Sequence, residues 1–132
     1  MTFAILNVSA ILTAALSAFA LGALWYAPFV FGAVWKRANG FTTDPPPRAT
    51  IFLLTFFFNL VMAVNLAIFL NSPKTTTAFG AAAGFAAGLG WAAMGLAIVA
   101  LFERRPWSYI LVNGGYLAVA LTLMGTILGA WR

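Results

Sequence analysis

The chain has 132 residues, of which 64% are hydrophobic and only 7% are charged, and its mean hydropathy is +1.00. Soluble domains carry about a quarter charged residues, so this composition excludes a water-soluble globule and indicates a membrane protein. The formal net charge of +5 does not indicate binding to nucleic acid, because the basic residues are scattered at segment ends and form no basic stripe.

The residue types that are missing limit the chemistry. The chain contains no His and no Cys, and its two acids are Asp44 and Glu103. Without thiolates, imidazoles or a pair of acids in one segment, neither a metal site nor acid and base catalysis can be built in the usual way. We therefore predict no catalytic, cofactor-binding or metal-binding residues and expect no enzymatic activity.

Four long uncharged segments predict membrane-spanning helices. Each can cross about 30 Å of hydrocarbon at about 1.5 Å per residue, and helices satisfy the backbone groups within each segment. The first segment follows no basic residue and is longer than a signal-peptide core, so we interpret it as a retained span. We predict an all-α polytopic membrane protein, a single four-helix domain over residues 1–132, with spans at about 3–24, 50–70, 78–102 and 107–130.

The connection 25–49 is the only one long enough to hold structure of its own. It begins with aromatic residues, including Trp25, Tyr26 and Trp35, and ends in three prolines, 45–47. This order predicts an interfacial or re-entrant segment followed by an extended tether. Its role is left open between an anchor at the membrane interface and a plug or ligand lip under the bundle.

The basic residues indicate an orientation in the membrane. Five of them lie in the first and third connections, and Lys74 and Arg132 lie on the other side. By the positive-inside rule, both termini are expected outside the cytoplasm. We expect the bacterial inner membrane as the location, although the moderate bias leaves dual topology open.

Small residues recur at steps of four on the third span and leave one face of that helix smooth. Such a face lets another helix approach closely. We favour packing inside one bundle over a dimer interface, and both interpretations stay open. The third-span strip is Gly80, Gly84, Gly88 and Ala92, and shorter strips are Ala10, Ala14, Ala18 and Gly22 on the first span and Gly125 with Gly129 on the fourth.

Polar side chains within the spans need partners. Asn59 on the second span and Asn113 with Tyr116 on the fourth lie on faces that could meet. They either form hydrogen bonds between helices or line a shared cavity, with Trp25 and Tyr26 near its mouth. The candidate cavity lining is therefore Asn59, Asn113, Tyr116, Trp25 and Tyr26.

Several motifs resemble those of the bacterial membrane family known as domain of unknown function 1761. They are the run from Leu21 to Pro28 (LGALWYAP), then Phe31-Gly32 and Trp35-Lys36, followed by Glu103 to Pro106, Asn113 to Tyr116, and Gly125 to Trp131. The resemblance covers nearly the whole chain. It implies a compact four-helix membrane protein and brings no substrate or catalytic residue with it.

Three classes of function follow from these observations. The first, and the function that we predict from the sequence, is a small channel-like or transporter-like homo-oligomer, with a dimer favoured, in which symmetric association encloses a path for a small solute or ion. The second is a scaffold or accessory subunit that binds a partner membrane protein or lipid without transporting anything. The third, a membrane enzyme, has the least support, because the chain lacks His, Cys and a buried acid.

Overall fold

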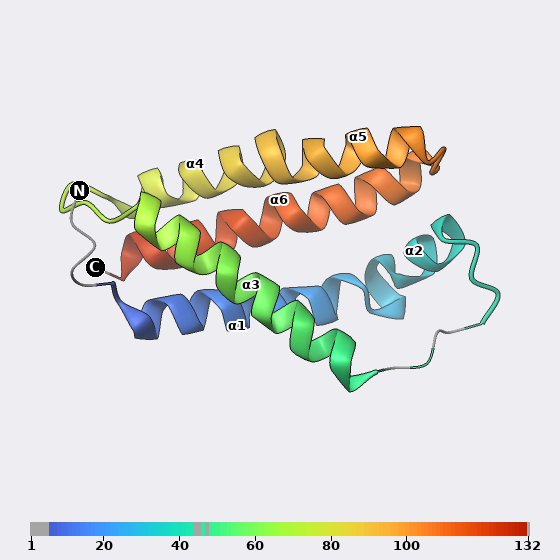
Figure 1. Cartoon of the computed structure of the whole chain (residues 1–132), viewed down its shortest axis with the longest axis horizontal. Coiled ribbons are helices and arrows are strands. Elements are labelled where there is room, and N and C mark those ends of the chain that lie inside the picture. The colour runs from blue at the N-terminus through green and yellow to red at the C-terminus, as the bar shows by residue number, and fades with distance from the viewer. Residues whose placement is uncertain (1–5, 44–45, 47, 132) are drawn as a thin grey trace.

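The computed structural model describes residues 6–43, 46 and 48–131. The regular structure of these residues is helical (Figure 1). The elements are α1 (Val8–Trp25), the π-helical η1 (Pro28–Gly32), α2 (Ala33–Ala38), α3 (Ala49–Phe69), α4 (Thr77–Ala87), the π-helical η2 (Gly88–Ala93), α5 (Met94–Phe102) and α6 (Trp107–Ala130). The predicted start of the first span at 3–5, and Asp44, lie outside the described residues.

Four helical segments of the described chain are long and apolar enough to cross a membrane, which confirms the all-α membrane class. They are Val8–Trp25, Ala49–Phe69, Thr77–Phe102 and Trp107–Ala130. The third segment is continuous through α4, η2 and α5. The orientation of these helices in a bilayer is a prediction from the basic residues.

Helix α6 lies at the centre of the bundle. The α4–α5 segment runs alongside it on one face, α1 packs on another, and α2 packs near its start (Figure 1). Helix α3 crosses α1 obliquely, so its first half diverges from the rest. We call the end where α1 and α5 finish and α3 and α6 begin the basic end. It carries Lys36, Arg37, Arg48, Arg104 and Arg105, whereas Lys74 lies at the opposite end.

The closest helix contact joins α4 to α6 through glycines on both sides. A Cβ atom added at Gly84 would clash with the carbonyl oxygen of Leu121, and one at Gly80 with that of Gly125. A Cβ at Gly129 would lie 2.6 Å from the carbonyl oxygen of Thr76. The backbones therefore touch without intervening side chains. This is the packing expected of small residues in lipid, where burying apolar surface gives helices little reason to associate.

The π-helical turn η2 changes the register of this contact. A π-turn holds one residue more than the corresponding α-helical stretch, so the face that follows it is rotated. The small strip continues from Gly88 to Ala93, which is buried, while Ala92 is partly buried beside it. A Cβ at Gly114 on α6 would lie 3.3 Å from the Cβ of Ala93. The sequence spacing predicted Ala92 as the next member of the strip, because it assumed an unbroken α-helix.

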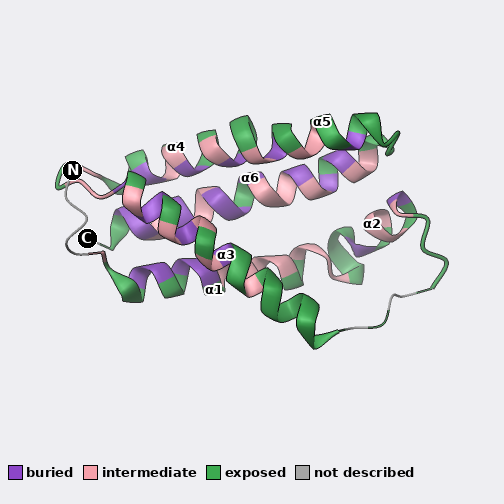
Figure 2. Cartoon of the chain, viewed as in Figure 1, coloured by how far each residue is buried: buried purple, intermediate pink, exposed green. Residues whose placement is uncertain are grey.

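A second, side-chain core joins α1, α3 and α6. Ala10, Ala14 and Ala18 of α1 are fully buried against the apolar faces of the other two helices. Towards the basic end, Phe19 of α1 still makes edge-to-face contacts with Phe52 and Phe56. Most of the first half of α3 is exposed (Figure 2). Since the helix is apolar, we infer that lipid covers this half.

The glycine contact makes a testable prediction. Gly84→Ala should lower the free energy of unfolding by about 1–3 kcal/mol, because a backbone clash cannot be relieved by turning a side chain. Gly95→Ala is the matched control, since nothing lies within 4 Å of a Cβ there, and it should raise stability by up to about 1 kcal/mol. Unfolding by dodecyl sulfate in mixed micelles, followed by circular dichroism, measures both values. Equal effects at the two positions would contradict the packing described.

Candidate functional site

The end of α1 is fastened to α6 by two adjacent side chains. The indole Nε1 of Trp25 donates a hydrogen bond of 2.9 Å to the carbonyl oxygen of Val112. The hydroxyl of Tyr26 donates one of 2.6 Å to Oδ1 of Asn113. Two consecutive residues therefore bind two consecutive residues of the neighbouring helix. This arrangement fixes the rotation of α1 about its own axis and the position of α1 along the axis of α6.

Tyr116, one turn further along α6, extends the connection to α3. Its hydroxyl donates a hydrogen bond of 2.8 Å to the carbonyl oxygen of Ala18, and the side chain of Asn59 on α3 lies near enough to interact with it. Gly22 makes room for this ring, since a Cβ there would lie 3.3 Å from the hydroxyl oxygen. Asn59 is only 4% exposed, so it is a buried polar side chain beside this hydroxyl.

The segment that follows α1 folds back over these residues. The ring centroid of Phe31 lies 4.6 Å from that of Trp25, and the centroid of Trp35 lies 5.8 Å from that of Tyr26. Gly32 permits the fold, because a Cβ there would lie only 2.5 Å from the carbonyl oxygen of Tyr26. The short helices η1 and α2 therefore act as an aromatic cover on the hydrogen-bonded residues.

The hydroxyl of Tyr26 is held in its protonated form. Burial, with smaller contributions from Tyr116 and Tyr109, raises its pKa above the ordinary value. The group therefore remains a hydrogen-bond donor to Asn113 throughout the physiological pH range.

All five residues predicted to line a cavity lie in this region, which we call the Tyr26 cluster. It consists of Trp25, Tyr26, Asn59, Asn113 and Tyr116. Across the described residues, every buried side-chain nitrogen and oxygen atom has a hydrogen-bond partner. The geometry thus favours hydrogen bonding between helices over an open lining, and the role of these residues in a cavity stays a prediction.

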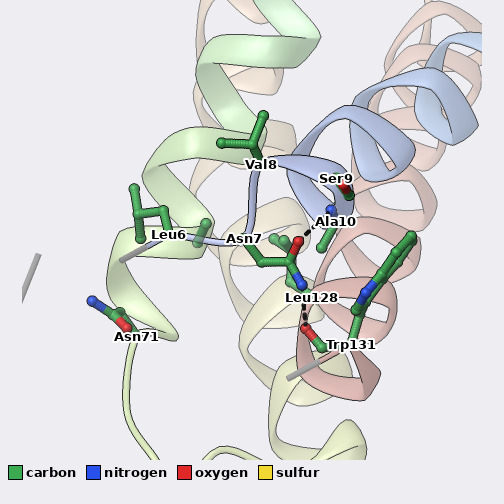
Figure 3. A pocket seen from close by; sticks show the side chains of 9 residues that line it. Leu6, Asn7, Val8, Ser9, Ala10, Asn71, Leu128 and Trp131 are labelled. Atoms are coloured by element: carbon green, nitrogen blue, oxygen red, sulfur yellow. Dashed lines mark hydrogen bonds between the residues drawn. The ribbon is translucent and has the colours of Figure 1, made fainter. Parts of the chain in front are cut away.

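A small pocket of about 440 Å³ lies at the opposite end, where α1 begins (Figure 3). Asn7 stands at its centre, and its Oδ1 accepts from the backbone N–H of Ala10 at 3.1 Å and so caps α1. The amide of Asn7 donates to the carbonyl oxygen of Trp131 at 3.3 Å. Both of its polar atoms are therefore engaged in fixing helix ends. The capping role of Asn7 could have been predicted, because an asparagine directly before an apolar run is a helix-capping signal.

A larger hollow of about 820 Å³ opens on the outside of the bundle between α3 and α4. Its floor includes Ala82, Ala83, Ala86 and Ala87 of α4, and Asn65 and Leu66 of α3 line its other side. Sequence reasoning missed this groove. It exists because α3 packs on α1 and not on α4, and helix spacing does not reveal that choice of neighbour.

No group of three or more His, Cys, Asp or Glu side chains gathers in the described region. Glu103, at the turn between α5 and α6, forms an ion pair of 3.5 Å with Nε of Arg105. This is the interfacial pairing expected from its position directly before two arginines.

The Tyr26 cluster predicts a measurable contribution to stability. Tyr26→Phe should lower the free energy of unfolding by about 0.6–1.7 kcal/mol, the range found for hydrogen bonds between membrane helices. A double-mutant cycle with Asn113→Leu should show a coupling of similar size. Tyr109→Phe is the control, because the aromatic ring that lies 5.2 Å from the Arg105 guanidinium is kept. If the two tyrosine variants unfold alike, the Tyr26 bond contributes nothing.

Comparison with known proteins gives a family and no function. No curated protein and no solved structure matches the chain. A family model described as "protein of unknown function (DUF1761)" matches residues 9–129. The matched region contains both halves of the Tyr26 cluster, the motif that ends α1 and the Asn113 to Tyr116 motif of α6. The resemblance noted from the sequence is thereby confirmed, and the chain belongs to the DUF1761 family of membrane proteins.

Proposed function

We propose that the protein is a non-catalytic membrane scaffold that assembles with a second copy of itself through the α3–α4 groove. One observation carries the proposal: a hollow of about 820 Å³ lies on the outer surface, between α3 and α4. The polar residues of the interior, in contrast, are bonded to one another. Such an arrangement favours a protein that acts through contacts on its surface.

The shape of the groove suits a helix. Alanines form much of its floor, so another backbone can come close. Phe69 and Phe79 are stacked at 6.4 Å, with 14° between their planes, and close the groove at the end opposite the basic end. Trp91 stands at its edge and is 84% exposed. A large exposed ring beside a small-residue floor gives a second helix an apolar wall to pack against.

Asn65 is the reason for choosing a second copy as the occupant. It is exposed on α3 and lines the groove, and its amide donates only to the carbonyl oxygen of Val61 in its own helix, at 2.9 Å. A polar side chain that faces hydrocarbon is costly and needs a partner. An amide is both donor and acceptor, so two Asn65 side chains related by a twofold axis can bond to each other.

The inner strip of the third span is a poorer candidate for self-association. Gly80, Gly84 and Gly88 are buried, and α6 of the same chain occupies them. A second copy could reach them only by displacing α6. We therefore propose that the dimer forms through the alanine face of α4 and not through its glycine face.

The proposal includes the absence of enzymatic activity and a location in the bacterial inner membrane. The first is supported by a sequence without His and Cys. The second follows the resemblance to a bacterial membrane family. With the basic end in the cytoplasm, both termini face the other side, as the count of basic residues favours.

Crosslinking tests the dimer without interference, because the natural chain contains no cysteine. Val61→Cys lies one turn from Asn65 on the exposed side of α3 and should form a disulfide-linked dimer in native-like vesicles. Adding Asn65→Leu should lower the dimer population by about threefold or more, which corresponds to about 0.6 kcal/mol. Adding Ala86→Phe, which fills the groove, should lower it further.

Ile98→Cys is the matched control, because this residue is also exposed but lies on α5, which contributes no residue to the groove, whereas Val61 lies on α3, which does. It should give little crosslinked product. Equal crosslinking from both cysteines would indicate random collision. A Val61→Cys protein that stays monomeric at every ratio of lipid to protein would remove the proposed interface.

Transport remains a second candidate, because the five residues predicted to line a cavity do gather at one place. A path through them would require their hydrogen bonds to open. We expect liposomes with the wild-type protein to be no more permeable to small ions than protein-free liposomes. Flux through the wild-type protein that the combined Asn59→Leu and Asn113→Leu variant loses would instead favour transport.

A further inference from the structure

The basic end combines charge with exposed apolar rings. Arg37, Arg48 and Arg104 are exposed there. Phe29 is 80% exposed and Phe102 is 86% exposed at the same end. Apolar rings next to arginines match the boundary between acyl chains and headgroups in a bilayer.

Arg105 differs from the other three arginines, because the protein already balances its charge. It is paired with Glu103 at 3.5 Å and lies over the ring of Tyr109 at 5.2 Å. Asp44 aside, Glu103 is the only acid in the chain. Positive charge at the basic end is therefore in excess and needs an external counter-charge.

Arg104 adds a conformational observation. Its φ is 61°, and no other residue except glycine has a positive φ in the described chain. It follows the end of α5, where the backbone N–H of Arg105 donates to the carbonyl oxygen of Ala100 at 2.9 Å and that of Arg104 donates to Leu101 at 3.1 Å. These bonds define a Schellman-type helix end, whose left-handed position normally holds glycine. A strained arginine at such a position suggests that its charge has a use.

We propose that the basic end binds the phosphate groups of anionic phospholipids, with Arg104, Arg37 and Arg48 as the contacting residues. Charge complementarity selects this occupant, and the exposed rings of Phe29 and Phe102 contact the acyl chains of the same lipids. The binding orders anionic lipid around one end of the bundle. It does not depend on the proposed dimer, because none of these residues lines the α3–α4 groove.

Native mass spectrometry tests the proposal with the full chain in a neutral detergent. The protein is mixed with equal amounts of phosphatidylglycerol and phosphatidylcholine, and the bound lipids are counted. The wild-type protein should retain mainly phosphatidylglycerol. Each of Arg37→Gln, Arg48→Gln and Arg104→Gln should weaken this binding by about fivefold, and the triple variant should lose the preference.

Two further variants separate a lipid site from a structural effect. Lys74→Gln removes one positive charge at the opposite end and should leave the preference unchanged. Arg104→Gly should weaken phosphatidylglycerol binding yet raise the midpoint of unfolding, because glycine accepts the left-handed conformation without strain.

Three results would overturn the proposal. The first is a triple variant that still prefers phosphatidylglycerol, and the second is a Lys74→Gln variant that loses as much binding as Arg104→Gln. The third is displacement of the bound lipid by inorganic phosphate, because the site would then recognise free phosphate and not a lipid surface.

Discussion

The backbone contact between the glycine faces of α4 and α6 is the constraint on which the rest of the bundle depends. Lipid tails are as apolar as leucine, so burying apolar side chains provides little drive for helices to associate in a membrane. Close packing replaces that drive, and it is closest where Gly80 and Gly84 meet α6. With α4 on one face of α6 and α1 on another, α3 packs mainly on α1. The outer groove is the result.

The Tyr26 cluster works from the other side of α6. Its bonds are directional, whereas the glycine contact is steric, and the two fix different degrees of freedom. The glycines set the distance between α4 and α6. The bonds of Trp25 and Tyr26 set the rotation of α1 and its position along α6. Small residues serve both contacts, since Gly22 and Gly115 admit the rings of Tyr116 and Trp25. Steric packing thus holds α6 on the face toward α4, and hydrogen bonds hold it on the face toward α1.

Much of this fold could be predicted, because lipid imposes simple rules on a sequence. Long uncharged runs had to be helices, and the strip at Gly80, Gly84 and Gly88 had to pack closely against something. The face carrying Asn59 could be placed toward Asn113 and Tyr116 by helical spacing. The partner of each strip could not be predicted, because spacing identifies a face and not its neighbour. The sequence also gave no sign that the π-turn would bring Ala93 into the position predicted for Ala92.

Trp25 and Tyr26 have a more specific role in the structure than the general rule for aromatic residues at span ends predicted. Aromatic residues at span ends usually serve as interfacial anchors, so the sequence interpretation placed them at the mouth of a cavity. In the structure both residues make hydrogen bonds to α6. The sequence contained the residues that form this connection. They are a tryptophan followed by a tyrosine at one helix end and an Asn-Gly-Gly-Tyr run on another helix. Only the register between α1 and α6 was missing, and register is set by tertiary packing.

The distribution of satisfied and available polar groups bears directly on what the protein can do. A polar group in hydrocarbon is stable only when it is bonded. In the interior this condition is met within one chain, and opening the Tyr26 cluster for a solute would break the hydrogen bonds that join α1 and its C-cap residue to α6. On the surface, Asn65 is bonded only within its own helix, and the basic end carries excess charge. A bundle of this kind would gain free energy by binding a neighbour at its surface, which is the physical basis of the proposed function.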